Sequence, residues 1–202
     1  MAAIWRSEKV GDMNHEVILE GFGCKLRPAS LDDSQFIVEL RNMDFAKGNI
    51  NRTSTDVERQ KEWMRKYLAR PDDYYWLISP ANGEGRPVGT IGLYDFTPDR
   101  REAMPGRWVM MNQTSFNVMA PIFLVYRFAF ESLGVDRLVM DVVSDNRKVR
   151  RFHELYGARP MACPERYRQE TQASGLDLAW YELPAADWPA MKACWQPILE
   201  TF

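Results

Sequence analysis

The sequence has 202 residues, which is enough for one domain with a sizeable hydrophobic core. Its 26 basic and 28 acidic residues give a formal net charge of −2, which offers no electrostatic indication of nucleic-acid binding. The three cysteines, Cys24, Cys163 and Cys194, show no C-x-x-C spacing, which favours a reducing compartment and argues against a disulfide framework or a zinc site. We find neither a signal-peptide segment nor an apolar run of spanning length, so we expect a cytoplasmic protein without a membrane span.

The first half of the chain predicts a hairpin, two helices and a run of antiparallel strands. Residues 1–14 mix charged and apolar residues without a period, as is typical of a loose tail. Strand-like runs on either side of Gly21-Phe22-Gly23 predict a hairpin that ends at Pro28. Apolar residues at helical spacing then predict a helix that ends at Asn42, and a second helix is expected after residue 55. Further strands are expected over residues 74–79, 88–96 and 103–112.

The central stretch from Trp108 to Gly157 carries the strongest pattern. A helix is expected from near Val118 to Gly134, and it is apolar on nearly every side, so it should be buried. Its charged residues, Arg127 and Glu131, have the i,i+4 spacing of an exposed ion pair. A β-branched strand over residues 137–143 follows, and then a helix that starts after an asparagine and ends in glycine.

The last part of the chain predicts a hairpin and a final helix. Residues 165–172 and 176–183 could pair as strands around Ala173-Ser174-Gly175. Residues 185–202 are expected to form an amphipathic helix, packed on the domain or at a dimer contact, because one helical stripe carries Trp188, Met191, Trp195, Ile198 and Phe202. Helices, antiparallel strands and then a strand–helix–strand unit make an α+β pattern.

The central stretch resembles the GCN5-related N-acetyltransferases (the GNAT superfamily). Residues 130–138 are similar to the family's "aFe-LG-hRl" run, and residues 146–158 to its "N-x-x-a-x-x-l-y-e-k-l-G-f" run. The resemblance spans roughly residues 26–160, and residues 15–184 are expected to form the domain. It implies an α+β (α/β layered) fold in which a twisted, mixed, mostly antiparallel sheet splays between its fourth and fifth strands and is flanked by helices. It also implies acetyl-CoA as cosubstrate, with its pantetheine arm in the gap, and no metal.

The resemblance places the donor site along the fourth strand and the turn after it. Met110 and Met111 would border the pantetheine arm. The family's phosphate-binding turn reads Q/R-x-x-G-x-G/A, and here Gln113 takes the first position while Phe116 and Val118 replace the glycines, so Cβ atoms would crowd a pyrophosphate. Either the amides of residues 118–120 still donate to the phosphates, or the turn merely connects strand to helix.

Asn146 and His153 are the donor-site candidates on the following helix. Asn146 is expected to cap that helix, and the resemblance adds contact with the pantetheine amides. His153 shares a helix face with Phe152 and Tyr156, so it should point toward the sheet. It occupies the position where the family commonly has the tyrosine that protonates the leaving thiolate, and an imidazole of pKa about 6.5 releases a proton more readily than a phenol. We therefore predict His153 as the catalytic acid; the alternative is a half-buried structural histidine.

For a general base, the acidic residues near the expected acceptor cleft are Asp95 and Glu102. Leu40-Arg41-Asn42, followed by Trp63-Met64 in the next helix, resembles the GNAT branch that acetylates nucleotide-linked 4-amino sugars in surface-glycan synthesis, and relatives that modify ribosomal proteins share this pattern. Arg41, Asn42 and Asp95 are thus the substrate-binding candidates. The alternative for the first two is an ordinary helix C-terminus with a cation at its dipole.

Together these patterns predict an acetyl-CoA-dependent N-acetyltransferase that acts on the primary amine of a small molecule, with a nucleotide-linked amino sugar as the candidate acceptor. The alternative is a GNAT-like protein with a degenerate CoA site, which uses acyl-carrier-protein donors or serves as a non-catalytic binding module. A homodimer through the C-terminal helix is left open.

Overall fold

The computed structural model describes residues 14–46, 50, 54–82, 86–111 and 116–201. Most of the predicted tail, Gln113 and Phe202 therefore lie outside the described residues. The strands are β1 (Leu19–Gly21), β2 (Cys24–Pro28), β3 (Tyr74–Pro80), β4 (Gly89–Tyr94), β5 (Glu102–Met110), β6 (Arg137–Val143), β7 (Arg159–Met161) and β8 (Leu178–Pro184). The α-helices are α1 (Ser34–Arg41), α2 (Val57–Leu68), α3 (Ala120–Arg127), α4 (Arg147–Leu155), α5 (Arg168–Ser174) and α6 (Trp188–Leu199).

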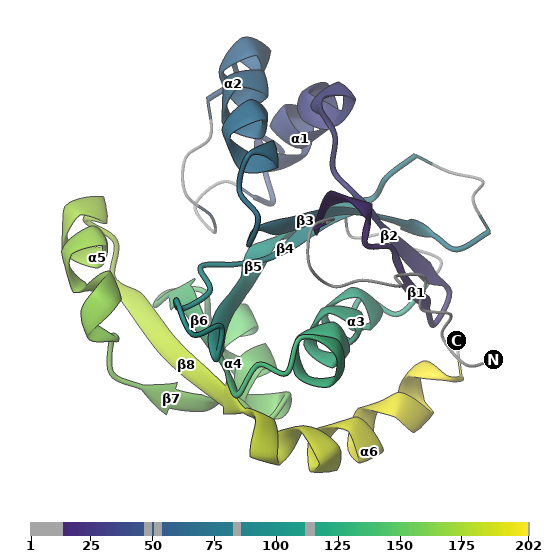
Figure 1. The fold of residues 1–202 in the computed structure, drawn as a ribbon, viewed down its shortest axis with the longest axis vertical. Coiled ribbons are helices and arrows are strands. Elements are labelled where there is room, and N and C mark those ends of the chain that lie inside the picture. Colours follow the sequence, from purple (N-terminus) through teal and green to yellow (C-terminus); the bar gives the residue numbers. More distant parts are fainter. Residues whose placement is uncertain (1–13, 47–49, 51–53, 83–85, 112–115, 202) are drawn as a thin grey trace.

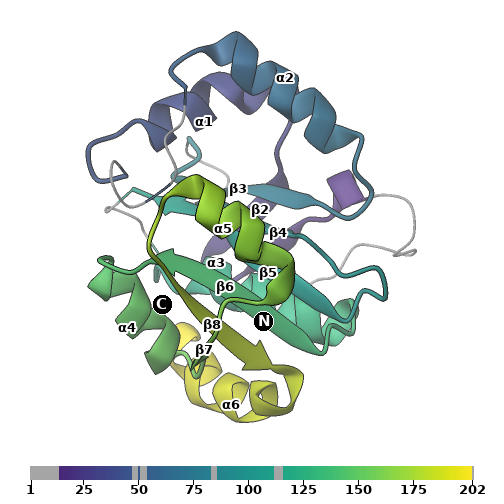
Figure 2. The same cartoon turned by 90° about the vertical axis from the view of Figure 1, so that its left-hand side faces the viewer.

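These strands form one mixed sheet in the order β1-β2-β3-β4-β5-β6-β8-β7, with helices on both faces (Figures 1 and 2). Neighbouring strands are antiparallel except β5 and β6, which are parallel. The parallel pair is registered only at Glu102↔Arg137 and Ala103↔Leu138. Beyond these residues the two strands separate. The splayed, mostly antiparallel sheet predicted from the sequence is thus confirmed. The gap was expected between the fourth and fifth strands and lies between β5 and β6. The numbers differ by one because the resemblance begins at β2, so that β1 is an additional strand before it.

Alternation along β3 shows how the two faces of the sheet are covered. Tyr74 and Trp76 belong to the main core under α3, whereas Tyr75 and Leu77 pack with α1 and α2 on the other face. Helix α3 is buried from Ala120 to Tyr126, as its apolar sequence predicts, and a π-helical turn (Phe128–Ser132) extends it. This helix fills the concave side of the sheet in Figure 1.

Arg127 and Glu131 attract each other electrostatically, as their i,i+4 spacing predicts, but Glu131 also has partners in α6. The Glu131 carboxylate accepts hydrogen bonds from Trp188 Nε1 and Lys192 Nζ, both at 2.7 Å, so it fastens α6 onto the end of the π-helical turn. Arg127 is half-buried above the ring of Phe22, with its Cζ 5.6 Å from the ring centroid. The i,i+4 spacing could not show the two α6 partners of Glu131, because they are distant in sequence.

Helix α6 packs back on the same domain. Trp188, Met191 and Leu199 are buried in the main core, and Trp195 stacks on Tyr156 with 4.6 Å between ring centroids. Ile198, which the sequence placed on the same stripe, is exposed. Most of the apolar stripe of α6 is therefore packed against the same domain.

The predicted hairpin over residues 165–183 is wrong in its first half. Residues 165–174 form a short 3-10 helix, η4 (Glu165–Tyr167), and then α5, which ends at Gly175 with a φ of 65°. Only Tyr167 is buried in this segment, so it lacks the alternating apolar residues that a strand would bury. β8 pairs instead with β6 and β7, and α5 lies over the face of the sheet opposite α3.

Candidate functional site

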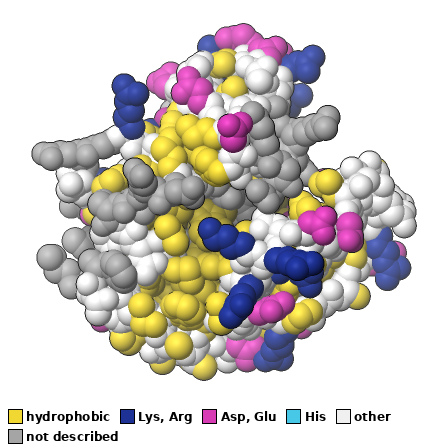
Figure 3. Space-filling model, turned by 180° about the vertical axis from the view of Figure 1, so that it is seen from behind, with side chains coloured by type: hydrophobic (Ala, Val, Ile, Leu, Met, Phe, Trp, Pro, Cys, Tyr) yellow, Lys and Arg dark blue, Asp and Glu magenta, His cyan; other side chains and the backbone are white. Residues whose placement is uncertain are grey.

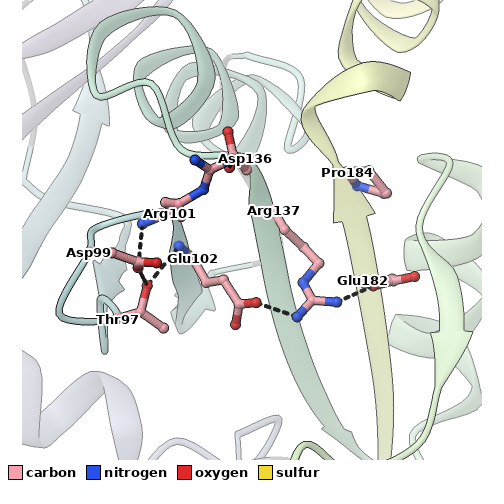
Figure 4. Close-up of a pocket in the computed structure, with 8 residues that line it drawn as sticks. All are labelled: Thr97, Asp99, Arg101, Glu102, Asp136, Arg137, Glu182 and Pro184. Carbon is pink, nitrogen blue, oxygen red and sulfur yellow. Dashed lines mark hydrogen bonds and ion pairs between the residues drawn. The ribbon is translucent and has the colours of Figure 1, made fainter.

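An ionic cluster holds the closed end of the gap between β5 and β6. Arg137 of β6 donates to Glu102 of β5 and, at 2.9 Å, to Glu182 of β8 (Figure 4). Arg166 of η4 lies 3.5 Å from the second Glu102 oxygen. A shallow depression is lined at this place by Thr97, Asp99, Arg101, Glu102, Asp136, Arg137, Glu182 and Pro184. Because Glu102 pairs with Arg137 and Arg166, it stabilises the sheet and is not available as the general base that the sequence allowed.

The open end of the gap is bordered by aromatic side chains of β5 and α4. Trp108 of β5 contacts Phe152 of α4, with 5.0 Å between ring centroids. The buried Trp108 Nε1 has no hydrogen-bond partner among the described residues. Met110 packs against the main core, and Met111 joins the small cluster around Leu40 and Val109. The gap is therefore apolar along β5, with one unused donor.

Asn146 caps α4, as the sequence predicts: its side-chain oxygen accepts from Val149 N at 3.2 Å. Of the basic residues that follow, Arg150 donates to Tyr181 Oη and Ser144 O, both at 3.1 Å, whereas Arg147 and Lys148 are exposed. Helix α4 lies behind the sheet in Figure 1, and the face seen from behind carries a hydrophobic band beside a group of Lys and Arg side chains (Figure 3). This face thus combines an apolar strip with a charged flank of Lys and Arg side chains among which Asp and Glu also lie (Figure 3).

The turn before α3 offers fewer free backbone amides than a phosphate-binding turn needs. Phe116 is buried in the main core, and Val118 is exposed. The amide of Met119 donates to Asn117 Oδ1 and the amide of Ala120 to Asn117 O, both at 2.9 Å. Two of the three amides expected to meet a phosphate are therefore already bonded within the turn.

His153 faces the sheet, as its helical position predicts. It is 6% exposed and lies against the rings of Phe152 and Tyr181, with centroid separations of 5.8 and 5.4 Å. Burial lowers the pKa of His153 to about 4, and its buried Nδ1 has no partner. The imidazole is therefore neutral at pH 7. A thiolate forming beside it would raise this pKa, because a negative charge favours the imidazolium.

On the opposite face of the sheet, Arg107 organises the region between β5 and α2. It lies at an irregularity of the β4–β5 pairing with a φ of 50°, and its carbonyl accepts from Thr90 Oγ1 at 2.9 Å. Its guanidinium pairs with both oxygens of the buried Asp73 and lies 3.9 Å from the centroid of Tyr94 and 5.0 Å from that of Trp63. Arg107 thus ties three elements together.

The predicted acceptor residues Arg41 and Asn42 lie at the end of α1, next to this cluster. Burial, together with the nearby Arg107 charge, lowers the pKa of Arg41, while Tyr75 and Tyr94 oppose this effect. Asn42 Nδ2 donates to Val38 O at 2.9 Å, so the side chain closes the helix. The structure brings Arg41 toward the Arg107 cluster and gives Asn42 the local role of a helix end.

Asp95, the third predicted acceptor residue, follows β4 with a φ of 51°. It shares its surroundings with Asp141 of β6 and Glu170 of α5. Both aspartates are exposed, yet desolvation by the surrounding protein raises their pKa values; the Glu170 carboxylate adds to the effect, and the Arg107 charge opposes it at Asp95. The sequence reading missed Asp141, although an acid inside the apolar run 138–143 was a usable signal. It also missed Glu170, because it treated that segment as a strand.

The described residues contain no set of three or more His, Cys, Asp or Glu side chains arranged to hold a metal ion. No helix in this part of the chain is both long and apolar enough to cross a bilayer.

Comparison with known proteins identifies the fold family. The family model described as "Acetyltransferase (GNAT) domain" matches residues 24–159. The structure of apo FdhC, described as a nucleotide-linked sugar GNAT, is 26% identical, with a TM-score of 0.75 over 91% of this chain and 99% of that one. A GCN5-related N-acetyltransferase from Brucella melitensis is 21% identical, with a TM-score of 0.75 over 91% and 86% of the two chains.

A variant of the spermidine N-acetyltransferase SpeG from Vibrio cholerae shares the fold more distantly, at 15% identity and a TM-score of 0.65 over 83% of this chain and 97% of that one. No match was found among curated protein sequences. The matched domain covers more than half of the chain and contains both the β5–β6 gap and the Asn146-capped helix beside it. The chain therefore belongs to the GNAT acetyltransferase family.

Proposed function

We propose that this protein transfers an acetyl group from acetyl-CoA to the primary amine of a small molecule, with a nucleotide-linked amino sugar as the candidate acceptor. The observation that carries the proposal is the separation of β5 and β6 beyond Ala103 and Leu138, which leaves the edge of β5 unpaired beside α4. An extended pantetheine arm can bond to such an edge as an added strand does. The likeness to FdhC at 26% identity supports the choice of acceptor.

In this proposal the donor contacts Met110, Met111, Asn146 and the turn that contains Gln113, Phe116 and Val118. The acceptor lies on the opposite face, near Arg41, Asn42 and Asp95. The neutral amine nitrogen attacks the thioester carbon, the C–N bond forms as the C–S bond breaks, and the amine's surplus proton leaves for a base. His153, neutral in the free protein, takes up a proton from solvent as the thiolate forms and passes it to the sulfur. The protein's contribution is positioning and proton transfer.

Calorimetry with acetyl-CoA tests the donor half directly. We expect saturable binding, and thiol release when amines are added to the complex. Absence of binding at millimolar acetyl-CoA would refute the proposal. His153→Ala should lower turnover by roughly 10²–10⁴ with donor affinity little changed, and His153→Tyr should recover part of the rate. A well-folded alanine variant with full turnover would remove His153 from the mechanism.

A second candidate function keeps the fold and changes the donor. The amides of Met119 and Ala120 are already bonded to Asn117, so the turn offers a pyrophosphate fewer donors than a bare helix start. An acyl-carrier-protein donor presents no pyrophosphate to this turn. Turnover with acyl-carrier protein and none with CoA esters would favour this candidate, and no turnover with either would favour a binding module.

A further inference from the structure

Two polar atoms are buried without partners next to the acceptor face. Tyr167 of η4 is 8% exposed and Trp180 of β8 is 5% exposed, and neither Tyr167 Oη nor Trp180 Nε1 has a hydrogen-bond partner in the part of the chain that the structure describes. Their rings stack with 4.9 Å between centroids and 24° between planes. Buried polar groups in folded proteins are nearly always bonded, so two such atoms in one stack require an explanation.

Both side chains lie near carboxylates that have no partner among the described residues. Trp180 is directly opposite Asp141 in the β6–β8 register, so the two side chains share one face of the sheet. The Tyr167 hydroxyl lies within electrostatic range of Asp95 and Asp141. Neither aspartate makes a side-chain hydrogen bond or ion pair with another residue in the described part of the chain.

The chemistry of these groups defines what would satisfy them. These two carboxylates attract a cation, Asp141 more strongly, because the charges of Arg107 and Arg166 partly offset that of Asp95. An indole N–H donates only, so it needs an oxygen or another acceptor, and a phenol hydroxyl can donate or accept. A ligand complementary to all four carries an ammonium group with an oxygen close to it. A plain polyamine meets the carboxylates and leaves the indole unbonded.

We propose that Asp141, Tyr167 and Trp180 form the subsite for the amine-bearing part of the acceptor, and that the acceptor carries a hydroxyl or ether oxygen beside its amine. This inference rests on the proposed acetyl transfer. Because both unpartnered atoms are covered, the segment η4–α5 shifts when the acceptor enters. Tyr167 is the one buried residue of Glu165–Ser174, so few contacts oppose this shift.

The indole N–H signal of Trp180 gives a direct test by nitrogen–proton correlation NMR. The chain has seven tryptophans, and the Trp180 signal is the one that disappears in Trp180→Phe. Glucosamine and cyclohexylamine are matched probes, because both carry an ammonium on a six-membered ring and only the first has neighbouring oxygens. We expect glucosamine to shift the Trp180 signal, cyclohexylamine to shift it much less, and Asp141→Asn to abolish the response. No shift with glucosamine up to its solubility, or equal shifts with both probes, would overturn the proposal.

Tyr167→Phe separates this role from a structural one, because the two predict opposite signs. Removing a buried, unbonded hydroxyl should leave the melting temperature unchanged or raise it, while glucosamine affinity falls about five- to tenfold. The matched control is Tyr126→Phe, whose hydroxyl contacts Met140 Sδ at 3.0 Å in the core. That variant should lose stability and keep its affinity. A Tyr167→Phe protein with lowered melting temperature and unchanged affinity would assign Tyr167 to the fold alone.

Failure of the amine subsite can be distinguished from failure of the proposed acetyl transfer. If the Trp180 response is present but acetyl-CoA does not bind, the acetyl-transfer proposal fails while the amine subsite stands. If acetyl transfer occurs without any response at Trp180, only the subsite is wrong.

Discussion

The indole ring of Trp108 on β5 and the phenyl ring of Phe152 on α4 lie 5.0 Å apart, between centroids, across the open end of the β5–β6 gap. The two elements that would flank a donor molecule therefore touch each other in the free protein. A ligand that enters between them has to displace this contact. Such an aromatic pair is worth about 0.5–1.5 kcal/mol beyond its buried area.

Trp108→Ala should therefore tighten acetyl-CoA binding by about three- to tenfold, because the free energy needed to part the rings is removed. The same variant should melt at a lower temperature, since a large side chain is lost from the edge of the core. Trp108→Phe keeps an aromatic contact and is the matched control. Calorimetry measures the affinity. A weaker affinity in Trp108→Ala would show that the indole is a wall of the donor site.

The low pKa of His153 predicts a specific pH dependence of stability. The unfolded state binds a proton below about pH 6.5, whereas folded His153 resists protonation until about pH 4. Stability from this residue is thus present at neutral pH and is lost as pH falls through that window, by at most about 1.4 kcal/mol per pH unit. His153→Leu should remove this dependence. Urea denaturation at pH 7 and pH 5 measures it, and parallel pH curves for both proteins would contradict it.

Asp72 and Asp73 offer a matched comparison of exposed and buried ion pairs. The Asp73 side chain is 4% exposed and pairs with Arg107, whereas that of Asp72 is 43% exposed and pairs with Arg100. Asp73→Asn should destabilise the fold by about 3–5 kcal/mol, because it leaves a buried guanidinium without its counter-charge. Asp72→Asn should cost less than about 1 kcal/mol. Equal effects in chemical denaturation would show that Arg107 is adequately solvated without Asp73.

Substitution of Arg137 tests how much its ion pairs at the closed end of the β5–β6 gap stabilise the fold. Arg137→Met removes the cation between Glu102 and Glu182 and leaves two carboxylates facing each other. Because these side chains are partly exposed, we expect a loss of about 1–2 kcal/mol, reduced at high salt by screening of the carboxylate repulsion. Arg159→Met, which removes an exposed arginine paired with Asp187, is the control and should change stability little. Denaturation at low and high ionic strength measures both.

The sequence was sufficient for the fold because its strongest signals are local. The buried helix, the β-branched strand after it and the Asn146 cap each depend on residues close in sequence, and the structure confirms all three. The splay followed from the family resemblance that these elements carried. Residue spacing also placed His153 correctly on the inner face of α4.

The acceptor face could not be assembled in the same way, because its residues meet only through long-range pairing. Asp95 follows β4, Asp141 lies within β6 and Trp180 is brought beside it by the β6–β8 register. Once residues 165–172 were treated as a strand, Tyr167 and Glu170 were assigned to the wrong element. Burial and electrostatics at the site therefore had to come from the structure.

Four aromatic rings run in sequence from the donor gap to the C-terminal helix. Trp108 contacts Phe152, Phe152 stacks on Tyr156 at 5.0 Å, and Tyr156 stacks on Trp195 at 4.6 Å. A purification tag or fusion partner attached after α6 that pulls on this helix would consequently loosen α4 at the gap. Tags are better placed at the N-terminus when donor affinity is to be measured.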